Sequence, residues 1–246
     1  MSLPSIPPAL SQEEIRTRDD SLEFARRHKN EIARELTNLT LFLPDALPVS
    51  VFMAGSPGAG KTESSQNLIK KFSSDHPSIL RIDPDELRTK FSTYTGKNSH
   101  LFQGATSIIV DRMHDLALKN KQSFVFDGTL TNLEKSRDNI RRSVERGRFV
   151  QIIYVYQDPL QAWEFVKART AKDGRHVPKE AFIKQYFLAR ENTNCLKGEF
   201  GKQIQVDLIT KNIDGTDFSY RQNIETIDSQ ITEKYGKGEL HLVIKD

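Results

Sequence analysis

An eight-residue segment, Gly55-Ser56-Pro57-Gly58-Ala59-Gly60-Lys61-Thr62, restricts the possible folds of this chain more than any other feature. It has the pattern G-x-x-x-x-G-K-[ST], whose glycines let the backbone curl so that successive N–H groups face a bound phosphate. The apolar run 49–54 precedes it and a helical pattern follows it, which is the context that this motif requires. A chance match in a glycine-rich turn is the alternative. We predict a phosphate-binding loop between a strand and a helix.

The residues at the end of this loop indicate which ligand it holds. Lys61 can reach the β- and γ-phosphates of a nucleotide, and the hydroxyl of Thr62 can ligate Mg²⁺. The helix that follows adds the positive end of its dipole. We expect the nucleotide-binding residues to be Gly55, Ser56, Pro57, Gly58, Ala59, Gly60, Lys61, Thr62 and Glu63.

Short apolar runs alternate with helical patterns along most of the chain. The apolar runs are 49–54, 79–82, 123–126, 149–156 and 204–209, and the helical patterns are 62–72, 105–119, 134–147, 160–171 and 179–192. This alternation is typical of βαβ units. We predict an α/β fold of the P-loop type, a doubly wound and mainly parallel five-stranded sheet with helices on both faces. Residues 240–244 form a further apolar run that could add an edge strand.

The first 48 residues have a different character. Residues 1–10 hold three prolines and are expected to form a flexible lead, and Ser11-Gln12-Glu13-Glu14 has the form of a helix capping box. Apolar residues at helical spacing then predict one or two amphipathic helices over about 12–40. We expect an N-terminal helical extension over 1–48 and a catalytic domain over 49–246. The extension either packs on the domain or covers its site.

Composition excludes several classes of protein. Lys plus Arg is 36 and Asp plus Glu is 33, so the net charge is +3, which argues against a nucleic-acid partner. Cys195 is the only cysteine, so no intramolecular disulfide forms, which fits a reducing compartment. No apolar run approaches the roughly 20 residues of a membrane span, and no secretory signal is visible. We expect a cytoplasmic protein with no membrane association.

Carboxylates follow two of the expected strands. Asp83 and Asp85 come after the run 79–82, and Asp127 comes after the run 123–126. Ligands of open α/β sheets lie beyond the carboxyl ends of the strands. Asp85 could therefore take or orient the proton of a hydroxyl nucleophile, and Asp127 could help hold Mg²⁺. Alternatively, Asp85 is a favourable acid in the first turn of a helix, and Asp127 belongs to a turn. For Asp83 we favour the role of a helix cap.

A basic cluster lies between two of the helical patterns. It consists of Arg169, Lys172, Arg175 and His176 around an Asp-Gly pair. Arginines on a mobile lid stabilise the charge that spreads over a phosphoryl group during its transfer. A solvated basic helix face is the alternative.

Together these motifs resemble the zeta toxin family of P-loop kinases over about residues 49–195. The resemblance rests on the loop Gly55–Thr62, on Ile82-Asp83-Pro84-Asp85, on Asp127-Gly128-Thr129, and on Arg169 with Gly174-Arg175-His176-Val177-Pro178. It implies that residues 49–246 are a kinase domain with an arginine-bearing lid at about 167–180. The sequence departs from the family pattern in two respects. Residues 1–48 precede the matched core, and one segment within the core differs. Leu130-Thr131-Asn132 stands where many members place an arginine that contacts substrate.

The resemblance also implies a role for each matched residue. The catalytic residues would be Asp85 as general base, and Lys61, Arg169 and Arg175 as the cations that bind the transferred phosphate. Substrate-binding residues would be Asp85, Asp127, where many members carry Glu, and Thr129. Metal ligands would be Thr62 and Asp127.

The family phosphorylates the sugar 3′-hydroxyl of UDP-N-acetylglucosamine with ATP or GTP and Mg²⁺, and an antitoxin holds it inactive. The resemblance therefore implies a toxin of a toxin–antitoxin system with a small-molecule acceptor. The partner would be an antitoxin protein, or residues 1–48 acting as one. A kinase for another small molecule or for a polynucleotide end, and a regulatory ATPase, are the alternatives.

Overall fold

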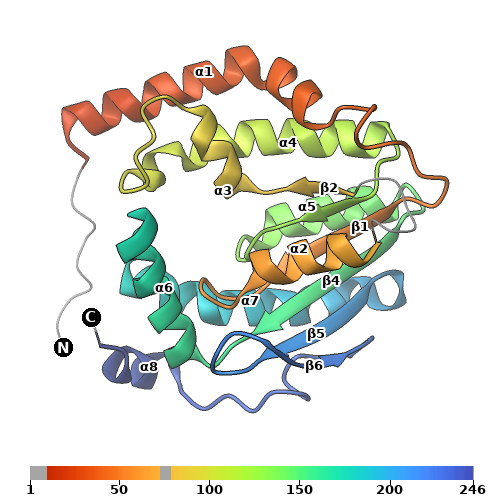
Figure 1. Ribbon diagram of the computed structural model, residues 1–246. Coiled ribbons are helices and arrows are strands. Elements are labelled where there is room, and N and C mark those ends of the chain that lie inside the picture. The colour runs from red at the N-terminus through yellow and green to blue at the C-terminus, as the bar shows by residue number, and fades with distance from the viewer. Residues whose placement is uncertain (1–9, 73–78, 246) are drawn as a thin grey trace.

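The computed structural model describes residues 10–72 and 79–245, which form an α/β structure around one sheet (Figure 1). The strand order in the described part of the chain is β2-β3-β1-β4-β5-β6. The first five of these strands are parallel, and β6 runs antiparallel to β5. The strands are β1 (Val49–Ala54), β2 (Leu80–Ile82), β3 (Phe124–Phe126), β4 (Phe149–Tyr156), β5 (Gln205–Lys211) and β6 (Asp217–Arg221). The predicted parallel sheet is confirmed, and β6 is a strand that the sequence did not predict.

Helices cover both faces of the sheet. They are α1 (Gln12–Leu36), α2 (Lys61–Phe72), α3 (Pro84–Leu87), α4 (Gln103–Lys119), α5 (Leu133–Val144), α6 (Pro159–Asp173), α7 (Lys179–Phe200) and α8 (Lys237–Val243). Short 3-10 turns are η1 (Arg88–Lys90), η2 (Ser99–Phe102) and η3 (Gly201–Gln203). The predicted alternation of strands and helices is therefore confirmed along 49–211.

The two faces of β1 show how the core is divided. Phe52 and Ala54 belong to the larger core cluster, which includes apolar residues of α4, α5 and α7. Val51 and Met53 alternate with them and pack instead with Leu68 of α2. Since successive side chains of a strand point to opposite faces, β1 is buried on both sides. It is the strand from which the phosphate-binding loop leaves the sheet.

A single helix, α1, occupies the region in which one or two helices were expected. It begins with the predicted capping box, in which the Glu14 N–H donates to Ser11 Oγ (3.2 Å) and the Ser11 N–H to Glu14 Oε2 (2.8 Å). The helix lies along α4 (Figure 1), and its buried residues Ala25 and Ile32 belong to the larger core cluster. The predicted lead lies outside the described residues except for Leu10.

The expectation of a strand over 240–244 is wrong, because this segment forms most of α8. Leu240 and Ile244 are buried four residues apart, whereas Leu242 between them is 83% exposed. A spacing of four places two side chains on one face of a helix, so packing selects the helix over the strand. None of the helices in the described ranges combines the length and apolar character that a membrane crossing needs.

We predict that Ile32→Ala lowers the free energy of unfolding by about 2–4 kcal/mol, because it leaves a cavity in the shared core. Chemical denaturation should show one transition at a lower midpoint, since α1 and the sheet share that core. Leu41→Ala, at a residue that is 60% exposed, is the matched control and should change stability little. A separate early transition would show that α1 unfolds independently of the domain.

Candidate functional site

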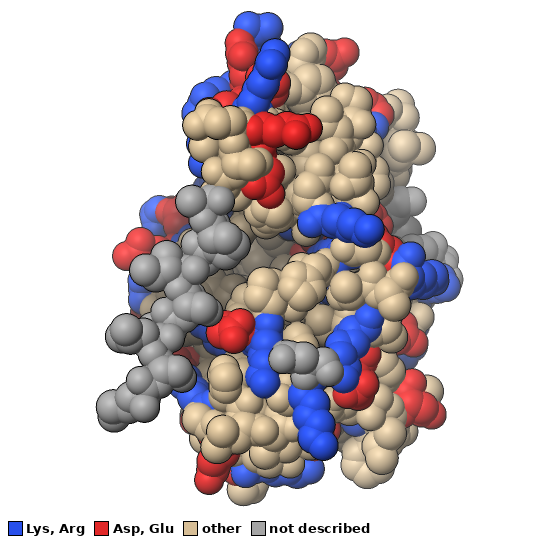
Figure 2. Space-filling model, turned by 90° about the vertical axis from the view of Figure 1, so that its left-hand side faces the viewer, with Lys and Arg blue, Asp and Glu red and all other residues tan. Residues whose placement is uncertain are grey.

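A large cavity opens beyond the carboxyl ends of the parallel strands. It encloses about 1600 Å³ and is lined by the loop 57–62, the segment after β2, the loop after β3, the end of α6 and part of α7. Figure 2 shows a hollow in this face of the molecule, with Lys and Arg side chains below it. The volume exceeds the roughly 300–1,000 Å³ of ordinary small-molecule pockets, so there is room for two ligands side by side.

The loop between β1 and α2 depends on close backbone packing at two glycines. Gly55 has φ 136° and Gly58 has φ 75°, a region that side-chain-bearing residues rarely adopt. A Cβ on Gly55 would lie 2.4 Å from the Val155 carbonyl oxygen, and one on Gly58 would lie 2.1 Å from that of Ala162. The glycines therefore let the loop rest directly on β4 and α6.

Lys61 places a half-buried cation within this loop. Its Nζ donates to the carbonyl oxygens of Ser56 (2.6 Å) and Gly55 (3.0 Å). Burial lowers the pKa of Lys61 to about 8, against the opposing effect of the Asp127 charge. Thr62 and Glu63 follow at the amino end of α2 and line the same cavity. The predicted phosphate-binding residues are thus gathered at one edge of the sheet.

Carboxylates at the ends of β2 and β3 meet at an arginine. Arg81 of β2 donates from Nη2 to Oδ2 of Asp83 (2.5 Å) and to Oδ2 of Asp127 (2.6 Å). Asp83 also accepts the Asp85 N–H (2.7 Å), which confirms it as the cap of α3. Burial raises the pKa of Asp83 to about 6, and the charges of Asp127 and Asp85 add to this effect.

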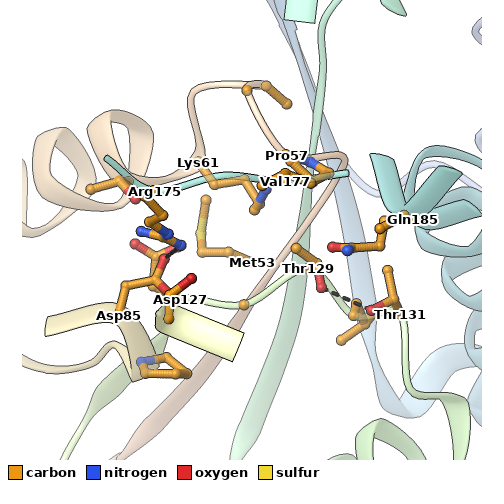
Figure 3. A pocket seen from close by; sticks show the side chains of 18 of the residues that line it. Met53, Pro57, Lys61, Asp85, Asp127, Thr129, Thr131, Arg175, Val177 and Gln185 are labelled. Carbon is orange, nitrogen blue, oxygen red and sulfur yellow. Dashed lines mark hydrogen bonds and ion pairs between the residues drawn. The ribbon is translucent and has the colours of Figure 1, made fainter. Parts of the chain in front are cut away.

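Asp85 is the carboxylate that faces the lid across the cavity. It pairs with Arg88 of η1 and with Arg175, whose guanidinium lies over it in Figure 3. Burial raises the pKa of Asp85, but the charges of Arg175 and Arg88 outweigh that effect and hold the pKa below its ordinary value. Asp85 is therefore ionised at neutral pH and bound to Arg175.

The predicted lid consists of the end of α6, the turn at Gly174 and the start of α7. Arg169 lies on α6 and Arg175 follows the turn, and both line the cavity rather than a solvated face. The Arg169 Nε is buried without a hydrogen-bond partner among the described residues. A buried, unpaired guanidinium N–H on a residue that lines the same cavity as the loop 57–62 fits an anionic ligand. Lys172 and His176 also line the cavity and are exposed.

The loop after β3 carries hydroxyl groups on the opposite side of the cavity. Thr129 and Thr131 share a hydrogen bond of 2.9 Å between their Oγ1 atoms, and Gln185 of α7 lies near them in Figure 3. Leu130 between them has φ 59°, and its carbonyl oxygen accepts a 2.8 Å bond from the Asn192 amide. This contact to α7 fixes the position of both threonines.

The structure adds site residues that the sequence reasoning missed. Arg81 and Arg88 bind the carboxylates, Ser65 bonds Asp127 (3.0 Å), and Gln185 lines the cavity. One signal was available for Arg81. It stands between the buried Leu80 and Ile82, so alternation along the strand turns it to the face that carries α2.

The donor set fits a magnesium ion that arrives with a phosphate. Within the described ranges, no group of three or more His, Cys, Asp or Glu residues is arranged to hold a metal. Thr62 supplies a hydroxyl, and Asp127 has Oδ2 bonded to Arg81 and Ser65, which leaves Oδ1 for a metal. Mg²⁺ binds in this way, through one or two carboxylates together with phosphates and waters.

Comparisons with known proteins agree with this geometry. The family model described as Zeta toxin matches residues 32–225. A chain of the PezAT chromosomal toxin–antitoxin system of Streptococcus pneumoniae superposes with a TM-score of 0.59 at 14% identity, covering 96% of this chain and 89% of that one. AvrRxo1-ORF1:AvrRxo1-ORF2 with ATP gives 0.55 at 16% identity, covering 89% and 73%. At these identities the two structures show a shared fold.

A further match is short. A genome polyprotein of Feline calicivirus is 42% identical over 50 residues, which is 20% of this chain. The match spans 3% of the length of that curated relative.

We predict that Asn192→Leu destabilises the protein by about 1–3 kcal/mol, because the buried Leu130 carbonyl loses its partner. Urea denaturation measures this change. Asn38→Leu is a suitable control, since that amide serves only an exposed turn around Thr40. Equal losses in the two variants would contradict the assigned role of Asn192.

Proposed function

Because the chain belongs to the zeta toxin family and is a P-loop kinase, we propose that it transfers the γ-phosphoryl group of ATP or GTP to a hydroxyl group of a small molecule. The observation that carries this proposal is the meeting of Lys61, Arg169 and Arg175 with the ionised Asp85 around one cavity. Three cations and one carboxylate are the groups that phosphoryl transfer to an alcohol requires.

The backbone N–H groups of the loop 55–62 and the Lys61 ammonium would hold the nucleotide phosphates. Lys61 now bonds two loop carbonyls, so it would exchange those bonds for phosphate oxygens. Thr62 and Asp127 are the residues that would hold Mg²⁺, which neutralises charge on the β- and γ-oxygens when bound. Arg169 would supply its unpaired N–H to the transferred group.

Asp85 would act as general base toward the acceptor hydroxyl. Arg175 now pairs with Asp85, and a γ-phosphate would compete for the same guanidinium. Drawing Arg175 toward the phosphate would free one side of the carboxylate for the hydroxyl proton. Asp127, Thr129 and Asp85 are the residues that we propose to contact the acceptor.

For the acceptor we propose UDP-N-acetylglucosamine, phosphorylated at its sugar 3′-hydroxyl. Support comes from the family match and from a cavity with room for two ligands. In this proposal the protein acts as the toxin of a toxin–antitoxin system, within the cytoplasm.

A protein partner would hold such an enzyme inactive. The Streptococcus pneumoniae neighbour comes from a toxin–antitoxin system. None of the described residues of the segment 10–48 lines the cavity, and α1 lies instead along α4. We therefore propose a separate antitoxin rather than inhibition by α1, and we propose that 1–48 is a helical extension of a kinase domain over 49–246.

The acceptor test uses purified protein with ATP or GTP, Mg²⁺ and candidate acceptors, and mass spectrometry of the products. Phosphorylated UDP-N-acetylglucosamine is the expected product. Phosphorylation of another sugar, of another small molecule or of a polynucleotide end would replace the acceptor but keep the kinase. Nucleotide hydrolysis with no acceptor dependence would reject the kinase proposal in favour of an ATPase.

In the same assay we predict that Asp85→Asn lowers kcat by about 100-fold or more, because the general base is lost. Nucleotide affinity, measured by calorimetry, should change little. Asp138→Asn, at a surface residue that pairs with Arg141, is the matched control and should retain full activity. An active Asp85→Asn variant would exclude Asp85 as the base.

We predict that Gly58→Ala reduces nucleotide affinity by about tenfold or more, because its Cβ would collide with the Ala162 carbonyl and displace the loop. Gly198→Ala is the matched control, since a Cβ there meets nothing within 4 Å. Nucleotide titration of both variants checks this prediction. Unchanged affinity in Gly58→Ala would show that the loop does not hold the phosphates.

A further inference from the structure

The guanidinium of Arg81 is bound to oxygen atoms from four side chains. Nη2 bonds Asp83 and Asp127, Nη1 bonds Glu86, and Nε bonds Ser65 Oγ (3.2 Å). These partners come from α2, α3 and the ends of β2 and β3, so one side chain joins four segments around the phosphate-binding loop. The Arg81 side chain is only 11% exposed.

Arg81 Nη2 lies between two carboxylate oxygens, at the place where a cation bridging them would have to lie. It lies 2.5 Å from Oδ2 of Asp83 and 2.6 Å from Oδ2 of Asp127. A divalent ion bridging these two oxygens would therefore need the space that the guanidinium occupies.

The charges of this cluster require a cation at this place. Asp83 and Asp127 have side chains that are 6% and 4% exposed, and each is bonded to Arg81. Without the guanidinium, two buried carboxylates would face each other without compensation, which is costly.

We propose that Arg81 is a positioning residue whose guanidinium occupies the place between Asp83 and Asp127 that a divalent metal would take. It thereby prevents the site from binding a divalent metal in the absence of nucleotide. It holds Asp127 by one oxygen and leaves the other for the metal that enters with a nucleotide. This inference rests on the proposed function in one respect, the role of Asp127 toward Mg²⁺.

The test measures Mn²⁺ binding to nucleotide-free protein by electron paramagnetic resonance, with no turnover involved. Wild-type protein should bind Mn²⁺ weakly. Arg81→Met should bind it at least tenfold more tightly, because two buried carboxylates lose their counter-ion. Adding Asp127→Asn to that variant should remove the gain.

Arg141→Met is the matched control, because Arg141 also bridges two carboxylates, Asp138 and Glu145, but on the surface. It should gain no Mn²⁺ affinity. Arg81→Lys keeps a positive charge but cannot bond all four partners, so we expect a smaller gain in Mn²⁺ affinity than in Arg81→Met. If Arg81→Met does not fold, the Mn²⁺ affinity of Arg81→Lys tests the proposal instead.

Three results would overturn the proposal. They are tight nucleotide-free Mn²⁺ binding by the wild-type protein, no gain in any folded Arg81 variant, and a gain that survives Asp127→Asn. An inactive wild-type enzyme with the expected Mn²⁺ behaviour would instead count against the kinase function alone.

Discussion

The contact between the phosphate-binding loop and α6 is the constraint on which the site depends. Gly58 lies so close to the Ala162 carbonyl that any side chain there would overlap it. Ala162 and Arg169 are two helical turns apart on the same side of α6. Fixing the first turn of α6 against the loop therefore places Arg169 at the cavity that the loop lines. The turn at Gly174 then brings Arg175 onto Asp85.

Much of this arrangement is encoded locally. The loop motif, the apolar strands and the carboxylates that follow them were all visible in the sequence, because each depends on neighbours in the chain. The cap at Asp83 was predictable for the same reason. Arg81 was not recognised, since its role depends on Asp127, Ser65 and Glu86, which come from other elements. Arg88 is a similar case.

The two errors in the fold also have physical causes. β6 is mostly exposed and pairs through its backbone with β5, so it leaves no apolar pattern to detect. The run 240–244 is apolar apart from His241, and only the burial of Leu240 and Ile244 distinguishes a helix from a strand. The net charge of +3 did not reveal the site either, because opposite charges converge there and cancel in the average.

The strand order has a consequence for the order in which the site can form. β1, which leads into the phosphate-binding loop, pairs with β3 and β4, so its partners are synthesised long after it. Such non-local pairings form late. Along the sequence, the cations of the site lie between Lys61 and Arg175. Helix α7 comes after them, and its Asn192 fixes the loop after β3. A chain still on the ribosome thus lacks part of its site until most of it has emerged.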